Sequence, residues 1–233
     1  MGKLFLIALA PIIICAVYLY IRDKYEKEPY RLLITGVLYG ILITFPIIHT
    51  EELVLIFIPN AGVLAEAAFL SFVVASLVEE TYKYAVLFFL LWKNKNLNEP
   101  YDGIIYAAFI SLGFATLENF LYVFNPELGG LETGYMRAVF SVPGHALFGI
   151  SMGYYFALAK LDTKRHMNCL ISAFFVPWLL HGIYDFILLS GMKYLMLIFI
   201  PFLIFLWSSG FKKIKSHLEN SPFKDRKRFR EGS

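Results

Sequence analysis

The sequence predicts an all-α membrane protein that folds as one polytopic bundle of about seven transmembrane helices. Of its 233 residues, 58% are hydrophobic and only 17% are charged, and the mean hydropathy is +0.63. Soluble domains carry about 25% charged residues, so this composition excludes a soluble enzyme. The two cysteines lie in apolar stretches, and we therefore expect no disulfide framework.

Seven apolar stretches are long enough, or nearly so, to cross a bilayer about 30 Å thick. The expected spans are residues 4–21, 32–49, 66–92, 103–124, 137–159, 168–189 and 192–209. Arg22 follows the first span without a small-residue cleavage site, so we interpret that span as a helix rather than a signal peptide. We expect residues 1–210 to form a single transmembrane domain and residues 211–233 a basic cytoplasmic tail. Segment 53–58 is apolar but too short to span, and we expect it in the membrane interface or folded back into the bilayer, or simply as a connector between helices.

Basic residues gather in alternate loops, and this sets the expected orientation. Loops 22–31, 93–102 and 160–167, together with the tail, hold 17 of the 21 lysines and arginines. Cytoplasmic loops carry such an excess, so we expect the N-terminus outside and the C-terminus in the cytoplasm. The tail is expected to lie against anionic lipids, and we expect no nucleic acid among the partners.

Four consecutive spans carry polar side chains within otherwise apolar sequence. These residues are Glu79, Glu80 and Lys83 in the third span, Glu118 and Asn119 in the fourth, His145 in the fifth, and His181 and Asp185 in the sixth. A charge at the bilayer centre costs about 2.5–3.5 kcal/mol, so such residues mark a functional site. At about 1.5 Å of rise per residue, all of them fall in the middle to outer half of the bilayer. We therefore expect them to meet in one buried polar cavity.

The spacing within two of these helices assigns partners. Lys83 follows Glu79 by four residues and Glu80 by three, so it can neutralise one of the two carboxylates. Asp185 follows His181 by four residues, so its carboxylate can accept a hydrogen bond from one imidazole nitrogen. That bond would fix the tautomer and leave the other nitrogen for a water, a substrate or a metal.

Together these residues form four motifs that resemble those of the PrsW family of intramembrane proteases. The motifs are EExxK at 79–83, FxxxEN at 114–119, PGHxxxG at 143–149 and HGxYD at 181–185. The resemblance implies a protease of the bacterial cytoplasmic membrane. It implies a first, site-1 cut in a membrane-anchored anti-sigma factor on its extracytoplasmic side. The pattern is more remotely similar to the CAAX prenyl protease and bacteriocin-processing group, but Lys83 replaces an arginine one position early and Glu118 stands where a histidine is expected.

Our preferred mechanism is peptide hydrolysis by an activated water. Glu79 or Glu80 is expected to act as the general base, with Glu118 as a second carboxylate nearby. His145 and His181 are expected to polarise the scissile carbonyl or stabilise the oxyanion. Contacts to substrate, or support of these groups, are expected from Lys83, Phe114, Asn119 and Asp185.

The same side chains also suit a metal ion. His145, His181 and Glu118 could hold one zinc ion, because two imidazoles and a carboxylate form a catalytic shell with an open position for water. The sequence does not separate this metal-dependent chemistry from a glutamic mechanism. The alternative function is a proton-coupled transporter with a relay of Glu, His and Asp side chains. The absence of inverted repeats in the sequence disfavours that alternative.

Overall fold

The described part of the chain is entirely helical in its regular elements. The structure is a computed structural model, and it describes residues 1–162 and 166–224. The helices are α1 (Gly2–Arg22), α2 (Tyr30–Leu55), α3 (Val63–Phe69), α4 (Ser76–Leu91), α5 (Pro100–Val123), α6 (Leu131–Met136), α7 (Val142–Leu161), α8 (His166–Leu189) and α9 (Lys193–Glu219). Two π-helices, η1 (Leu70–Ala75) and η2 (Arg137–Ser141), join α3 to α4 and α6 to α7 without a break. The expected all-α class is confirmed.

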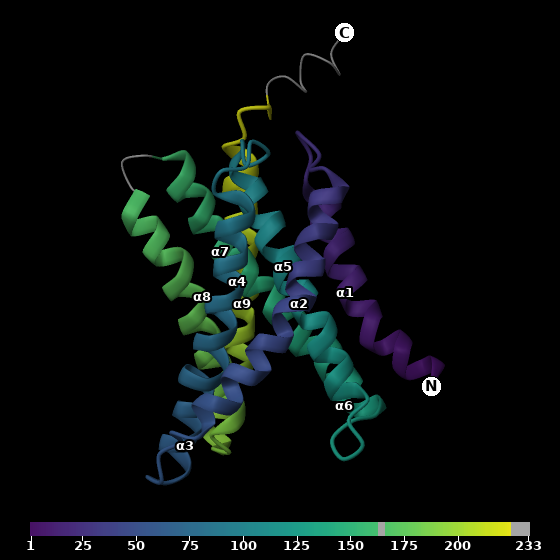
Figure 1. Cartoon of the computed structure of the whole chain (residues 1–233), viewed down its shortest axis with the longest axis vertical. Helices are drawn as coiled ribbons and strands as arrows, with labels where there is room; N and C mark the ends of the chain where they lie inside the picture. The colour runs from purple at the N-terminus through teal and green to yellow at the C-terminus, as the bar shows by residue number, and fades with distance from the viewer. Residues whose placement is uncertain (163–165, 225–233) are drawn as a thin grey trace.

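The helices form one elongated bundle, with α1 beginning at one end and α9 finishing at the other (Figure 1). Helices α1, α2, α5, α8 and α9 are long and apolar enough to cross a membrane. The composite helices from α3 to α4 and from α6 to α7 would complete seven crossings. Opposite ends for the start of α1 and the finish of α9 are what an odd number of crossings requires. The count of seven and the orientation stay predictions.

The bundle is built around α5 and α7, whose glycines allow the two backbones to touch. Every residue from Tyr101 to Ala115 is buried. A Cβ atom added at Gly153 would lie 2.0 Å from the carbonyl oxygen of Gly103, and one at Gly149 would lie 2.9 Å from that of Ala107. Small residues at these positions therefore permit close helix packing. The packing holds α7 firmly against the helix that carries the FxxxEN motif.

Each π-helix lies immediately before a helix that carries site residues. The η1 segment precedes Glu79 by one turn of helix, and η2 precedes His145. A π-helix is mostly a short insertion within an α-helix, and such insertions are frequent at functional sites. Sequence periodicity gave no signal of either insertion.

Four carboxylates are buried together where the 22–31 and 93–102 loops meet, and we call them the loop acidic cluster. Asp23, Glu28, Glu99 and Asp102 are each at most 3% exposed. Backbone amides of Glu99 and Glu28 donate to Asp102 Oδ2 and Asp23 Oδ2 at 2.7 and 3.1 Å. The hydroxyl of Ser221 donates to Glu99. Burial raises the pKa of Asp23 to about 6 and the pKa values of Glu28 and Glu99 to about 7.

Two helix ends differ from the expected spans. Helix α2 continues to Leu55, so half of the 53–58 segment prolongs a helix instead of forming a separate interfacial piece. Helix α9 continues to Glu219, past the expected end of the transmembrane domain at residue 210. Basic residues 164, 165, 226–228 and 230, which were used for the orientation, lie outside the described residues. Neither Cys15 nor Cys169 forms a disulfide bond within the described residues.

Candidate active site

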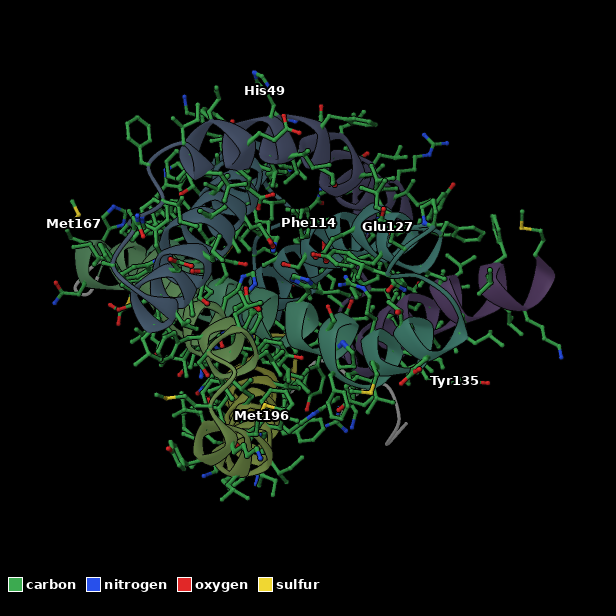
Figure 2. All side chains as sticks on the ribbon, turned by 90° about the horizontal axis from the view of Figure 1, so that it is seen from below. His49, Phe114, Glu127, Tyr135, Met167 and Met196 are labelled. Atoms are coloured by element: carbon green, nitrogen blue, oxygen red, sulfur yellow. The ribbon has the colours of Figure 1, made fainter. Side chains whose placement is uncertain are left out.

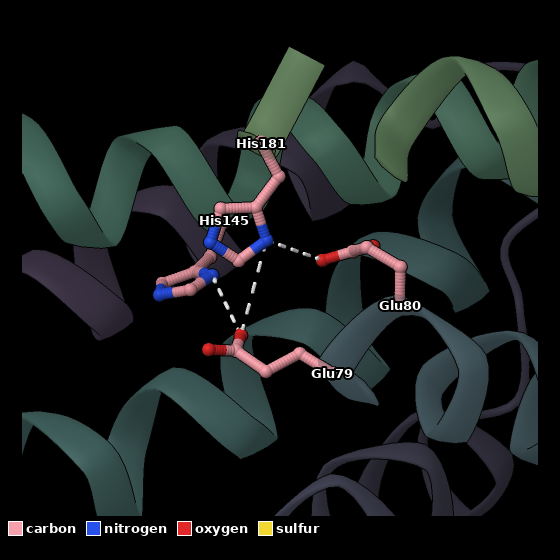
Figure 3. Close-up of side chains that lie close together, drawn as sticks. All are labelled: Glu79, Glu80, His145 and His181. Carbon is pink, nitrogen blue, oxygen red and sulfur yellow. Dashed lines mark hydrogen bonds and ion pairs between the residues drawn. The ribbon is translucent and has the colours of Figure 1, made fainter. Parts of the chain in front are cut away.

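Four buried side chains from three helices converge at one point inside the bundle (Figure 3). They are Glu79 and Glu80 from α4, His145 from α7 and His181 from α8, and we call them the inner group. One ligand atom from each lies within 4.8 Å of the others. None of the four is more than 5% exposed. The structure thus brings polar side chains from three of the four expected spans to one place.

The two adjacent glutamates of the inner group point in different directions. Neighbouring residues of an α-helix lie about 100° apart around its axis. Glu79 therefore lines a cavity, whereas Glu80 is fully buried behind it. Glu80 Oε1 lies 3.0 Å from Nδ1 of His181, and Glu79 Oε2 lies 3.9 Å from Nδ1 of His145. Since the Glu80–His181 pair is within hydrogen-bond distance, the two groups share one hydrogen or hold a cation between them.

On the side that faces away from the inner group, each imidazole contacts a second carboxylate. His145 Nε2 lies 2.8 Å from Glu118 Oε2, and His181 Nε2 lies 3.2 Å from Asp185 Oδ2. A carboxylate that accepts the Nε2 hydrogen leaves Nδ1 as the nitrogen facing inward. Both rings consequently present Nδ1 toward the inner group. Histidines that bind metals commonly have this outer carboxylate.

Lys83 supplies the positive charge at the centre of the inner group. Its Nζ lies 2.9 Å from Glu79 Oε2 and 2.9 Å from Glu80 Oε1, so it pairs with both carboxylates rather than the single one expected. Nζ also lies 3.4 Å from Nδ1 of His145 and 4.2 Å from the ring centroid of Phe114. The lysine is fully buried. A buried ammonium held by two carboxylates and an aromatic face offsets the cost of placing those acids there.

The inner group forms part of the wall of a cavity of about 560 Å³. This volume is in the range of ligand pockets, which run from about 300 to 1,000 Å³. Glu79, His145 and His181 line it together with the two outer carboxylates. Apolar side chains complete the walls: Ile47, Leu70, Phe140, Phe148 and Phe199. The arrangement suits an extended peptide whose backbone meets polar groups and whose side chains meet apolar walls.

The remaining expected site residues lie around this centre. Phe114, in the interior of the bundle (Figure 2), packs edge-on against His145 with ring centroids 5.4 Å apart. Asn119 is fully buried and donates to the carbonyl oxygen of Ala8 at 2.7 Å, which ties α5 to α1. Its role in the structure is therefore support of the helix that carries Glu118.

Two charged residues of the cavity were not identified from the sequence. Arg137 on η2 donates from Nη2 to Glu118 Oε2 at 2.7 Å and from Nε to Asn119 Oδ1 at 2.8 Å. Glu51, at the end of α2, lines the same cavity. The one signal for Arg137 was its position as a rare basic residue outside the four basic segments, two turns before His145. Glu51 gave no signal, because it follows the expected end of its span.

The inner group fits a divalent metal ion. In residues 1–162 and 166–224, no other set of three or more His, Cys, Asp or Glu side chains brings its ligand atoms so close. Two imidazole nitrogens and two carboxylate oxygens, each buried, are donors of the type found in catalytic zinc sites. Glu118, an expected ligand, lies outside this set because it contacts the far nitrogen of His145 and is held by Arg137.

Comparisons with known proteins found one matching family and several relatives. A family model described as PrsW family intramembrane metalloprotease matches residues 28–207. Protease PrsW of Geobacillus kaustophilus is 38% identical over 208 residues, which is 88% of each chain. Protease PrsW of Clostridioides difficile is 38% identical over 94% of this chain and 92% of its own, and that of Bacillus subtilis is 37% identical over 89% and 92%. No solved structure matches the chain.

Proposed function

Because the chain belongs to the PrsW family of intramembrane metalloproteases, we propose that it makes the first, extracytoplasmic cut in a single-span membrane protein such as an anti-sigma factor. Family membership makes it a protease and an integral membrane protein. The observation that carries the proposal is the buried inner group at the wall of a 560 Å³ cavity within the helical bundle. Membership in a protease family also removes the support for a proton-coupled transporter.

Glu79 is the proposed general base of the reaction. It lines the cavity, whereas Glu80 is fully buried and bound to Lys83 and His181. A base must reach the proton that it abstracts, directly or through one water, and only Glu79 of the pair borders the space where a substrate fits. Glu80 then serves to hold His181 and Lys83 in place.

The two imidazoles are proposed to act on the scissile carbonyl. Their Nδ1 atoms face the centre, and the outer carboxylates Glu118 and Asp185 fix their orientation. Because Nε2 carries the hydrogen in this arrangement, each Nδ1 presents a lone pair, and the rings would act on the carbonyl through a metal ion that they hold. The cavity walls around this point are mainly apolar.

We propose zinc as the metal, which His145, His181 and Glu80 would hold, while Glu79 of the same inner group stays free to act as the base. Bound there, a divalent ion supplies a Lewis acid and a water that is nucleophilic at neutral pH. Lys83 contacts three of these four side chains. The ammonium and a metal ion would therefore compete for the same carboxylate oxygens.

The experiment compares membrane proteins cut in cells that carry the wild-type chain with those in cells that carry Glu79→Gln. The variant keeps the shape of the side chain and removes its basicity, so we expect its cleavage rate to fall by about 10²–10⁴. Glu52→Gln is the matched control, because Glu52 is on the neighbouring helix with a side chain 69% exposed. The proposal predicts a single-span protein that is shortened with the wild type and the control but intact with Glu79→Gln. Equal processing in all three strains would overturn it.

A further inference from the structure

We propose that Arg137 is a positioning residue of the reaction, which holds Glu118 so that His145 directs Nδ1 toward Glu79. The inference rests on the proposed function of the inner group. No step of the chemistry assigned above uses Arg137, and the guanidinium does not touch the inner group itself. It acts through Glu118, and Glu118 acts through the imidazole.

One carboxylate oxygen joins the arginine to the histidine. Glu118 Oε2 accepts from Arg137 Nη2 at 2.7 Å and from His145 Nε2 at 2.8 Å. On the other side of the ring, Nδ1 of His145 lies 3.9 Å from Glu79 Oε2. Successive contacts thus lead from the guanidinium of Arg137 through Glu118 to His145, whose Nδ1 lies near the proposed general base.

Three residues of one turn of α5 fix the guanidinium in place. Nε donates to Asn119 Oδ1 at 2.8 Å while Nη2 binds Glu118. The carbon of the guanidinium lies 4.2 Å from the ring centroid of Tyr122. A planar guanidinium that donates two hydrogen bonds and stacks on a ring is held in one orientation. A lysine side chain could not fully reproduce this arrangement. Glu118 therefore receives a fixed partner rather than a mobile charge.

Because the contact between Arg137 and Glu118 is largely buried, its loss would affect His145. The side chains of Arg137 and Glu118 are 12% and 18% exposed. Losing the guanidinium would leave Glu118 as an uncompensated, nearly buried carboxylate, free to turn toward water at the cavity mouth. His145 would then lose the acceptor that keeps its hydrogen on Nε2. Its Nδ1 would no longer be held facing the inner group.

The π-helix η2 explains how two residues of one helix reach the same oxygen. Arg137 and His145 are eight positions apart, about 12 Å of rise in a regular α-helix. The wider turns of η2 lie between them, and the long arginine side chain covers the remaining distance. A purely structural role, tying η2 to α5, would need only the contacts to Asn119 and Tyr122.

The test combines cleavage kinetics with ¹⁵N spectra of histidine-labelled protein in detergent micelles. Removing an outer-shell partner typically costs 10–100-fold, so we expect Arg137→Gln to lower kcat by about that factor with KM nearly unchanged. We expect the wild type to hold His145 as the Nε2–H tautomer and Arg137→Gln to lose that preference. Arg137→Lys should recover part of the rate and the tautomer, since it restores a charge near Glu118. The control is Arg31→Gln, because Arg31 is exposed at the start of α2.

Two results would overturn the inference. One is an unchanged kcat and an unchanged His145 signal in Arg137→Gln. The other, which needs no variant that might misfold, is a wild-type His145 that carries its hydrogen on Nδ1. If no cleavage is found even for the wild type but the tautomer depends on Arg137, the proposed function fails while the positioning contact stands.

Discussion

Replacing Lys83 by methionine should strongly destabilise the protein. The change keeps the length of the side chain and removes the ammonium that contacts both Glu79 and Glu80. At 2.9 Å each contact carries about 6 kcal/mol of Coulomb attraction for an effective dielectric constant of about 20. Desolvation of the charges cancels much of this, and removing one partner of a buried pair costs about 3–5 kcal/mol. We therefore expect Lys83→Met to lower the free energy of unfolding by about 3–5 kcal/mol.

The assay is reversible unfolding in mixed micelles, followed by tryptophan fluorescence or circular dichroism. Lys193→Met is the control, since Lys193 is exposed at the start of α9. Adding Glu80→Gln to Lys83→Met removes a charge that the first change leaves unpaired, so the double variant should be more stable than Lys83→Met alone. A loss below about 1 kcal/mol for Lys83→Met, or a double variant less stable than it, would refute the idea that the ammonium balances both acids.

Three further predictions concern the metal, the loop acidic cluster and the orientation. A chelator should abolish cleavage, and His145→Ala and His181→Ala should each lose bound metal together with rate; full activity without stoichiometric metal would leave a glutamic mechanism. Burial raises the pKa of Glu99 from its usual 4.5 to about 7, so its stabilising contribution is full below about pH 4.5 and is lost as pH rises through 7. Glu99→Gln should therefore reduce the fall in unfolding temperature between about pH 5 and pH 8, and an unchanged fall contradicts that shift. A cysteine at exposed Glu127 should react with an impermeant thiol reagent in intact cells while one at exposed Lys95 should not, and the reverse pattern would invert the predicted orientation.

Helical class and approximate spans were accessible from the sequence because a membrane imposes a length on each apolar stretch. The ends of α2 and α9 could not be predicted from the sequence, because a helix can continue beyond the bilayer wherever its polar residues are still good helix formers. Thus Leu55 and Glu219 end their helices well past the last strongly apolar residue of each expected span. The π-helices were also not predictable, since a single inserted residue barely alters an almost uniformly apolar pattern.

The inner group was predictable because ionisable residues are rare and costly in a membrane, so the few present had to meet. Helix spacing also gave the partners within one helix, such as His181 with Asp185. Spacing within a helix does not predict contacts between different helices. The pairing of Arg137 with Glu118 depends on how η2 packs against α5, and the loop acidic cluster depends on two loops distant in sequence. Such contacts are set by tertiary packing and leave no local pattern in the chain.

The most direct test of a water-activating site in this cavity is cleavage in H₂¹⁸O. Purified protein in lipid nanodiscs would be mixed with a single-span substrate identified from the cell comparison, and the products analysed by mass spectrometry. We predict a new carboxyl terminus that carries one ¹⁸O atom, a cut on the extracytoplasmic half of the span, and no product from the Glu79→Gln/Glu80→Gln double variant. The same product formed at the same rate by that double variant would contradict the assignment of the chemistry to the inner group.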